Sequence, residues 1–377
     1  MLAHGVFRMP NAPVLDTGFS AVREPARGPD GSPMRPDGLH LPRAVGGNAV
    51  IGVWTPSSPA PARFPRRFSR AVAALEEDGF TVRCAARTRC DDGVGAGTPE
   101  ELAADLHGLL LDPDVDLVMC AVGGYTTVRV LPHLDFDLIR DCGKPVVGYS
   151  DVTSLLWAAL RCARTVTFHG PMVVSEWGEV GGAWPYTAAR FREAVSPWQG
   201  PVRLTAPSRW TDEFLLWEVD DVRPRRTRPA AWRTLAPGTA EGWLLPGCAP
   251  TASRLFGTPW MPDTQGAILC LETLGTGPEE FLGLLSQWRW SGQLDGIRGL
   301  VVGRHCRPTT SPPGDSSAFD RVVREALGRD DIPVMVDVDF GHTEPRLTLP
   351  VGVACRLDAT EQSLVITEPP VTSGGAP

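Results

Sequence analysis

The chain contains almost no lysine. Lys144 is the only one in its 377 residues, so arginine supplies nearly all of its 36 basic side chains. With 44 acidic residues the formal charge is -8. A protein that binds nucleic acid needs a basic face for the phosphates, and no basic run of that kind appears. The charge balance therefore argues against nucleic acid and acidic membranes as partners.

Other signals are missing too. None of the nine cysteines forms a C-x-x-C pair, and Cys120 and Cys270 lie inside apolar, strand-like runs, which is typical of reduced, mostly buried thiols. No apolar run reaches the roughly 18 residues that span a bilayer, and the first residues lack an apolar stretch of signal-peptide length. These absences predict a cytoplasmic protein without a membrane segment. We expect no metal and no cofactor.

The length and the composition indicate two domains. Residues 1–47 are rich in proline, glycine and arginine without a repeating apolar pattern, which predicts a poorly ordered extension. Residues 48–195 are expected to form an α/β domain. Residues 196–377 contain segments rich in tryptophan and proline, and they are expected to form a second domain of mixed α+β character.

Strand-like and helix-like segments alternate through the first domain. Short apolar runs end near Trp54, Cys84 and Val122, and apolar side chains recur at helical spacing between them. The segment from Thr98 to Glu101 is a capping box that opens one helix. This order predicts a parallel sheet of Rossmann or flavodoxin type with helices on both faces. Such sheets bind ligands at the carboxyl ends of their strands.

Ser150 stands where one apolar strand ends and a helix begins. The first backbone N–H groups of a helix have no partner and its dipole is positive there, which stabilises an alkoxide or an oxyanion. The segment lacks the second glycine of the G-x-S-x-G elbow. Ser150 or Asp151 could therefore serve only as a helix cap.

A second loop, Gly123-Gly124-Tyr125, follows a neighbouring strand. Paired glycines let backbone N–H groups approach a bound group closely, which suits an oxyanion donor. A tight turn without any chemistry would have the same sequence.

The second domain supplies two side chains that a serine nucleophile would need. Glu272 ends an apolar strand, and His342 follows a glycine in a turn that would let its ring project into a cleft. An imidazole oriented by a carboxylate can remove the proton of a serine hydroxyl. His133, His169 and His305 compete with His342 for the role of base.

Taken together, these motifs resemble those of the LD-carboxypeptidase family, the S66 serine peptidases. The resemblance implies that Ser150 is the nucleophile, that Glu272 orients His342, and that His342 is the general base. It also implies an oxyanion hole formed by the backbone N–H groups of Gly124 and Asp151, in an active site between the two domains. The matching motifs, in the family's order, are Val122–Tyr125, Gly148–Asp151, Thr258–Pro262, Leu271–Glu272 and Asp339–His342.

Within this family the chain looks more like the microcin C7 self-immunity branch than like the muramoyl-tetrapeptide carboxypeptidases. The latter carry an arginine directly before the paired glycines, where this chain has Val122. The resemblance implies a small peptide or aminoacyl-nucleotide substrate. Trp177 or Trp184 could stack on its base through a large aromatic face, although a loop tryptophan could equally pack against a partner subunit. Gly123 and Tyr125 are also expected at the substrate.

One departure from the family concerns Cys248. The chain reads Pro246-Gly247-Cys248-Ala249 where the family usually has Gly-Gly-Asn-Leu. A thiol hydrogen-bonds weakly, so this wall of the substrate site is expected to differ.

These features lead to three candidate functions. We also expect the protein to form a homodimer. The first is a serine hydrolase of self-immunity type that cleaves aminoacyl nucleotides or peptide-like antibiotics through an acyl-enzyme. The second is an LD-carboxypeptidase of cell-wall recycling, and the third is a non-catalytic or acyl-transferring homologue in a biosynthetic pathway. Val122 disfavours the second, and the intact motif set disfavours the third.

Overall fold

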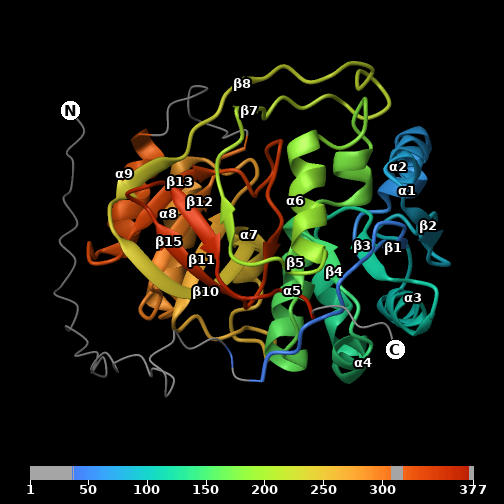
Figure 1. The fold of residues 1–377 in the computed structure, drawn as a ribbon, viewed down its shortest axis with the longest axis horizontal. Coiled ribbons are helices and arrows are strands. Elements are labelled where there is room, and N and C mark those ends of the chain that lie inside the picture. Colours follow the sequence, from blue (N-terminus) through green and yellow to red (C-terminus); the bar gives the residue numbers. More distant parts are fainter. Residues whose placement is uncertain (1–35, 37, 307–316, 373–377) are drawn as a thin grey trace, which may run out of the picture.

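Two β-sheets form the framework of the protein in a computed structural model that describes residues 36, 38–306 and 317–372. In Figure 1 the first part of the chain, coloured blue to green, lies on one side, and the orange and red elements lie on the other. The first sheet is almost wholly parallel and the second is mixed. This arrangement confirms the predicted fold class.

The N-terminal sheet has six strands in the order β14-β5-β4-β3-β1-β2. Every pair is parallel except β14 with β5. The runs predicted to end near Trp54 and Cys84 end at those residues, whereas the run expected to reach Val122 stops at Cys120, where the glycine loop begins. The strands are β1 (Val50–Trp54), β2 (Thr81–Cys84), β3 (Leu117–Cys120), β4 (Val146–Gly148), β5 (Phe168–His169) and β14 (Leu349–Pro350).

Helices cover both faces of this sheet. Side chains alternate along β3, so that Val118 and Cys120 pack with α3, α4 and α5, and Leu117 and Met119 pack with α2 and α6. Both sets are apolar because a covered sheet has no face exposed to water. The helices are α1 (Ala60–Arg63), α2 (Pro65–Glu77), α3 (Pro99–Leu111), α4 (Phe136–Asp141), α5 (Thr153–Ala158) and α6 (Pro185–Val195).

The C-terminal sheet has eight strands in the order β6-β16-β15-β10-β11-β12-β13-β9. The neighbours β10 to β13 are parallel, and the flanking pairs are antiparallel. One face packs on the helices α7 (Ala249–Ser253), α8 (Pro278–Trp290) and α9 (Ser317–Leu327). The strands are β6 (Val202–Leu204), β9 (Arg233–Ala236), β10 (Thr239–Cys248), β11 (Ala267–Glu272), β12 (Gly299–Gly303), β13 (Val334–Val338), β15 (Ala354–Asp358) and β16 (Ser363–Ile366).

Two segments connect the halves. Strand β14 comes from the C-terminal half but pairs with β5 of the first sheet, with Leu349 opposite His169. The ribbon of β7 (Arg209–Trp210) and β8 (Arg228–Pro229) encloses a long loop that reaches α2 (Figure 1). In that loop the Glu218 carboxylate accepts hydrogen bonds from the backbone N–H groups of Arg66 and Arg67 at 2.6 and 3.0 Å.

Residues 38–47 lie against the N-terminal domain, which differs from the extension expected over residues 1–47. His40 forms a parallel bridge with Thr165, and the N–H of Val45 donates to the Val195 carbonyl at 2.8 Å. Such backbone pairing needs no apolar periodicity, so the sequence pattern did not indicate it. Residues 1–35 and 37 lie outside the described part of the chain. Among the described residues, no helix has the length and apolar character needed to cross a membrane.

Candidate active site

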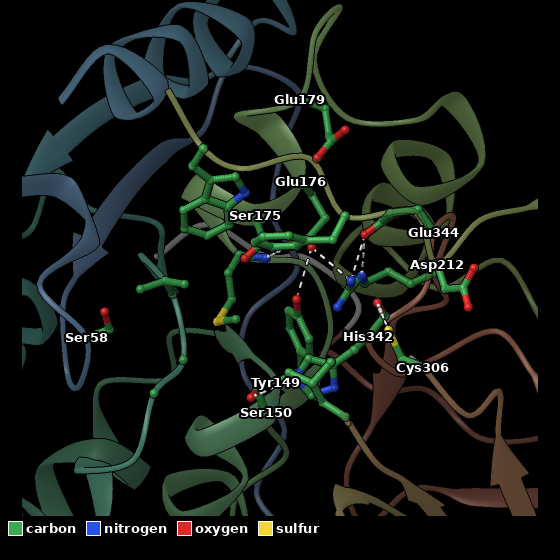
Figure 2. A pocket seen from close by; sticks show the side chains of 18 of the residues that line it. Ser58, Tyr149, Ser150, Ser175, Glu176, Glu179, Asp212, Cys306, His342 and Glu344 are labelled. Carbon is green, nitrogen blue, oxygen red and sulfur yellow. Dashed lines mark hydrogen bonds and ion pairs between the residues drawn. The ribbon is translucent and has the colours of Figure 1, made fainter. Parts of the chain in front are cut away.

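A cavity of about 550 Å³ is lined by residues of both halves of the chain. Figure 2 shows Ser150, Tyr149 and His342 close together on its wall, with Glu176 and Glu344 further along. Cavities of this size, with many apolar atoms and a few convergent polar groups, are typical of sites for small ligands.

Three of the predicted side chains meet at this cavity. Ser150 Oγ lies 2.9 Å from His342 Nε2, and His342 Nδ1 lies 2.6 Å from Glu272 Oε2. The Glu272 carboxylate is fully buried, and the His342 side chain is 10% exposed. With the proton of the ring on Nδ1, Nε2 is free to accept the proton of the serine hydroxyl. This is the geometry that an activated serine nucleophile requires.

The strand ends explain why these three residues meet. Ser150 follows β4, Glu272 ends β11, and His342 follows β13. The strands β11 and β13 lie in the parallel part of one sheet and β4 in the other, so the carboxyl ends of both sheets supply the site. Cys248, the last residue of β10, stands directly opposite Glu272 in the sheet register.

The backbone around Ser150 is unusual. Ser150 has φ +61°, in the left-handed region that residues other than glycine seldom adopt. The wall facing it is Gly123, where an added Cβ would lie 3.0 Å from Ser150 Oγ and 3.3 Å from the backbone nitrogen of Asp151. Only glycine leaves room for the hydroxyl here. In the part of the chain that the structure describes, the backbone N–H of Gly124 has no hydrogen-bond acceptor. This N–H is therefore available to a ligand.

The carboxylate of Asp151 connects several parts of the site. It is fully buried and accepts hydrogen bonds from Ser57 Oγ at 2.8 Å, from the Thr127 N–H at 2.8 Å and from Arg254 Nη1 at 3.0 Å. These partners come from the loop after β1, from the segment after the glycine pair and from the residue after α7. Neither Ser150 nor Asp151 makes a side-chain capping hydrogen bond to the helical turns that follow, so the alternative of a helix cap is not what the structure shows. Asp151 instead holds together the loops around Ser150.

The pKa values of Glu272 and of its neighbour Cys248 both differ from the ordinary values of these groups. Burial acts to raise the pKa of Glu272, but the neighbouring His342 and His169 outweigh it, and the pKa is lowered overall. Burial, together with the charge of Glu272, raises the pKa of the Cys248 thiol well above its ordinary value. Cys248 is therefore a neutral group in the cavity wall beside an ionised carboxylate.

A second, buried cluster of charges lines the cavity beside Tyr149. Arg346 Nη2 lies 2.6 Å from Glu344 Oε1 and 3.0 Å from Glu176 Oε1, and its guanidinium lies over the Tyr149 ring at 3.7 Å. The Tyr149 hydroxyl donates to Glu176, and the ring packs edge-on against His342 at 5.1 Å. Burial raises the pKa of Glu176 against the effect of Arg346, and the charge of Glu344 raises it further.

The competing histidines lie away from the cavity lining. His169 is fully buried, hydrogen-bonds to a backbone carbonyl, and has its pKa lowered to about 4, chiefly by burial. His305 stacks on Phe319 with ring centroids 3.5 Å apart, and His133 faces a glutamate of α3. Of the histidines considered as bases, His342 is the one that reaches Ser150.

The tryptophans do not lie where the sequence suggested. Trp177 is fully buried: its Nε1 donates to Asp78 at 3.0 Å, and its ring packs edge-on against Phe191 at 5.5 Å. The expectation that Trp177 stacks on a base is therefore wrong, because no face of the ring is open to a ligand. Trp184 is half-buried before α6 and is not among the residues that line the cavity, so the structure does not support that role for it either.

The aromatic surface of the cavity comes instead from Tyr125, Tyr149, Phe214 and Trp217. Trp217 packs against the Arg67 guanidinium at 4.5 Å and edge-on against Phe64 at 5.2 Å. Trp217 lies in the irregular loop between β7 and β8, and sequence reasoning passed over it because nothing local indicates that this loop folds back over the site. Of the predicted substrate residues, Gly123, Tyr125 and Cys248 do line the cavity.

Comparison with known proteins places this site in a family. Residues 51–170 match the LD-carboxypeptidase N-terminal domain, and residues 241–357 match the LD-carboxypeptidase C-terminal domain. The chain belongs to the LD-carboxypeptidase family. It is therefore related to hydrolases of the carboxypeptidase class.

Members of two functional kinds are similar to the chain. The microcin C7 self-immunity protein MccF of Escherichia coli is 30% identical over 337 residues, which cover 88% of this chain and 96% of that protein. A probable murein peptide carboxypeptidase of Bacillus subtilis is 29% identical over 329 residues, covering 87% and 94%. The solved structure of MccF in complex with aspartyl sulfamoyl adenosine has a TM-score of 0.83 at 29% identity and covers 88% of this chain and 99% of that one.

Sequence reasoning missed the charged residues of the cavity. Glu344 and Arg346 follow His342 closely, so the turn that supplies His342 could have signalled them. Arg254 gave no such signal, since its contact with Asp151 spans 103 positions. In the described ranges 38–306 and 317–372, no group of three or more His, Cys, Asp or Glu side chains is placed to hold a metal ion.

The raised pKa of Glu176 predicts a pH-dependent stability. The folded protein keeps a proton on Glu176 that the unfolded chain releases above the ordinary glutamate value of 4.5, so this group's contribution to folding is lost as the pH rises toward the raised value. We expect Glu176→Gln to make the free energy of unfolding, measured with urea, decline less between about pH 5 and 8. Glu179→Gln, which lines the same cavity, is the control and should keep the wild-type slope. Parallel curves for all three proteins would contradict this prediction.

The burial of Trp177 predicts a structural role. Trp177→Ala removes a large core side chain and should lower the free energy of unfolding by about 3 to 5 kcal/mol. Trp177→Phe keeps part of the packing but loses the bond to Asp78 and leaves a smaller cavity, so its cost should lie below that of the alanine variant. Urea denaturation measures both values. An alanine variant of unchanged stability would show that this ring is not part of the core.

Proposed function

We propose that this protein is a serine hydrolase of the self-immunity type, which cleaves the bond joining an aminoacyl group to a nucleotide-like or peptide-like antibiotic. The observation that carries the proposal is the pair of hydrogen bonds from Ser150 to His342 and from His342 to Glu272 at the wall of the cavity. Membership of the LD-carboxypeptidase family supports the hydrolase class.

In the proposed reaction, Ser150 Oγ attacks the carbonyl carbon of the scissile bond while His342 Nε2 takes the hydroxyl proton. The imidazolium is stabilised by Glu272, whose lowered pKa keeps the carboxylate charged. His342 then gives the proton to the leaving nitrogen, and the acyl group stays on Ser150 as an ester. A water molecule, deprotonated by the same ring, hydrolyses the ester and restores the hydroxyl.

The negative charge that develops on the carbonyl oxygen needs donors. We assign them to the backbone N–H groups of Gly124 and Asp151. In support, an added Cβ at Gly123 would lie 3.3 Å from the Asp151 nitrogen, so the glycine loop and the first turn after Ser150 lie close together. Backbone donors held in place before the reaction stabilise such an oxyanion at little reorganisation cost.

The substrate class rests on the aromatic surface of the cavity and on a relative. MccF has been solved with aspartyl sulfamoyl adenosine, and the chain shares its fold at a TM-score of 0.83. Trp217, placed in the cavity wall by the loop between β7 and β8, offers the stacking surface that an adenine would need. It takes the role that the sequence suggested for Trp177 or Trp184.

A murein peptide carboxypeptidase is the second candidate. The similarity to the probable murein peptide carboxypeptidase of Bacillus subtilis, at 29% identity, favours it. Val122 argues against it, because no cation stands directly before the glycine pair to hold a terminal carboxylate.

We further propose a cytoplasmic location and a homodimer. All nine cysteines lie in the described residues as free thiols, which suits a reducing compartment. Gel filtration with light scattering would measure the oligomeric state.

Ser150→Ala tests the reaction itself. Loss of the hydroxyl should lower turnover of a cleavable substrate by about 10³-fold or more while leaving ligand binding nearly intact, because the hydroxyl serves the covalent step. Mass spectrometry of products and calorimetric binding give the two measurements. Comparable loss of binding and of folding would instead indicate that Ser150 has only a structural role.

Trp217→Ala tests the substrate. For an aminoacyl sulfamoyl adenosine it should raise the KM, since a base stacked on an aromatic ring is worth about 1 to 3 kcal/mol. Trp184→Ala, outside the cavity lining, is the matched control and should leave the KM unchanged. Efficient release of D-Ala from a murein tetrapeptide, with no effect of Trp217→Ala on any substrate, would transfer the assignment to the carboxypeptidase.

A further inference from the structure

Arg254 is placed beside the proposed nucleophile by an element that the family motifs do not include. It is the first residue after α7, lines the cavity, and has a side chain that is 35% exposed. Its Nη1 lies 3.0 Å from the Asp151 carboxylate and 3.4 Å from the Tyr125 carbonyl oxygen. These partners are one of the proposed oxyanion donors and the neighbour of the other, so the guanidinium lies close to where a scissile carbonyl would be held.

The guanidinium of Arg254 still has donors to offer. Both of its hydrogen bonds come from Nη1, and Nη2 and Nε have no hydrogen-bond partner within the described chain. The charge of its partner Asp151 is already shared with Ser57 and with the Thr127 N–H. A planar fork with free N–H groups, fixed on one side by a buried carboxylate, is a suitable receptor for an anion.

Other arginines of the cavity are more fully used. Arg67 donates through all three of its nitrogens, to Val174, Ser175, Glu179 and Asp221. Arg346 is held between the side chains of Glu176 and Glu344, and its guanidinium lies over the Tyr149 ring. Arg254 is the arginine bonded to Asp151, next to Ser150, and this contact sets it apart from the others.

We propose that Arg254 binds an anionic group of the substrate next to the scissile carbonyl, on the leaving side. Arg254, the residue that follows α7, thereby supplies the cation that is missing at Val122. The inference rests on the proposed hydrolase function and deepens it by selecting substrates with charged leaving groups. Two groups have this chemistry: the terminal carboxylate of a leaving amino acid, and the ionised acyl sulfamate or acyl phosphoramidate that links an aminoacyl group to a nucleoside.

A purely structural role for Arg254 would look different in experiment. If it only neutralises Asp151, its loss disturbs the loops around Ser150 and affects every substrate alike. If it binds the anion, its loss affects only charged substrates. The test therefore compares pairs of related ligands in which one member has a negative charge next to the scissile carbonyl and the other lacks it.

The first pair is alanyl sulfamoyl adenosine, whose acyl sulfamate linker is ionised, and the amide of alanine with 5′-amino-5′-deoxyadenosine, whose linker is uncharged. The members of each pair are called charged and neutral for this one group alone. The second pair is a murein tetrapeptide and the same tetrapeptide with its terminal carboxyl amidated. Binding is measured by calorimetry on Ser150→Ala protein, which needs no turnover. Arg254→Met in this background should weaken binding of a charged member by about 10- to 100-fold, as for a lost hydrogen bond to a charged group, and leave the neutral member within about twofold.

The pair that responds identifies the anion that the protein takes. Arg254→Lys keeps the charge but not the fork and should fall between wild type and Arg254→Met. Arg63→Met is the matched control, since Arg63 also pairs with an aspartate, Asp91, but lies outside the cavity lining. This substitution should leave the affinity for both members of each pair unchanged. Equal losses for charged and neutral members, or no loss for either pair, would overturn the proposal.

Labelling with a fluorophosphonate separates this inference from the proposed function. Wild-type protein should be labelled at Ser150, and Ser150→Ala protein should not be labelled there. Failure of Ser150 to react, combined with charge-selective binding through Arg254, would refute the hydrolase function and leave the anion site standing.

Discussion

The hydrogen bond between Ser150 Oγ and His342 Nε2 joins two halves of the chain that are 192 positions apart, and the site depends on it. Contacts within its own half of the chain hold each of these two residues in place. Ser150 is held in a left-handed conformation after β4 and packs against Gly123, while His342 is oriented by Glu272 at the end of β11. Glycine is again required at position 341, where a Cβ would lie 2.7 Å from Glu272 Oε2. Close packing at Gly123 on one side and at Gly341 on the other therefore sets the position of the Ser150 hydroxyl relative to His342.

Local signals in the sequence predicted much of this. The Thr98 capping box opens α3 as expected, and Ser150 and Glu272 stand at strand ends because apolar runs with defined stops indicate strand ends well. The family resemblance contributed the choice of His342 over its competitors. The failures concern residues whose environment is set by distant contacts. Trp177 ends a short π-helix and Trp217 lies in an irregular loop, and only packing decides that one is buried against Phe191 while the other lines the cavity.

Charge in the cavity is arranged in pairs that leave few donors free. Asp151 is the central example, since its buried carboxylate engages Ser57, Thr127 and Arg254 and so ties loops of both domains to the residue beside Ser150. Along the wall, the Arg346 guanidinium pairs with the carboxyl groups of both Glu176 and Glu344. The raised pKa of Glu176 favours its protonated form, which reduces the negative charge of this group. Since burial makes such groups costly when unpaired, the cavity is held in one charge pattern, and a ligand must match it.

Strand β14 has a consequence for how the protein is made. The N-terminal sheet is complete only when Leu349 and Pro350 pair with β5, although its other strands all lie within residues 50–169. During synthesis the N-terminal domain therefore emerges from the ribosome with the β5 edge unpaired, and the edge stays open until residues 349–350 have also emerged. An open strand edge invites pairing with other chains. The segment that brings the histidine to the serine is thus also the one that closes this edge, so protection from aggregation and completion of the site arrive together.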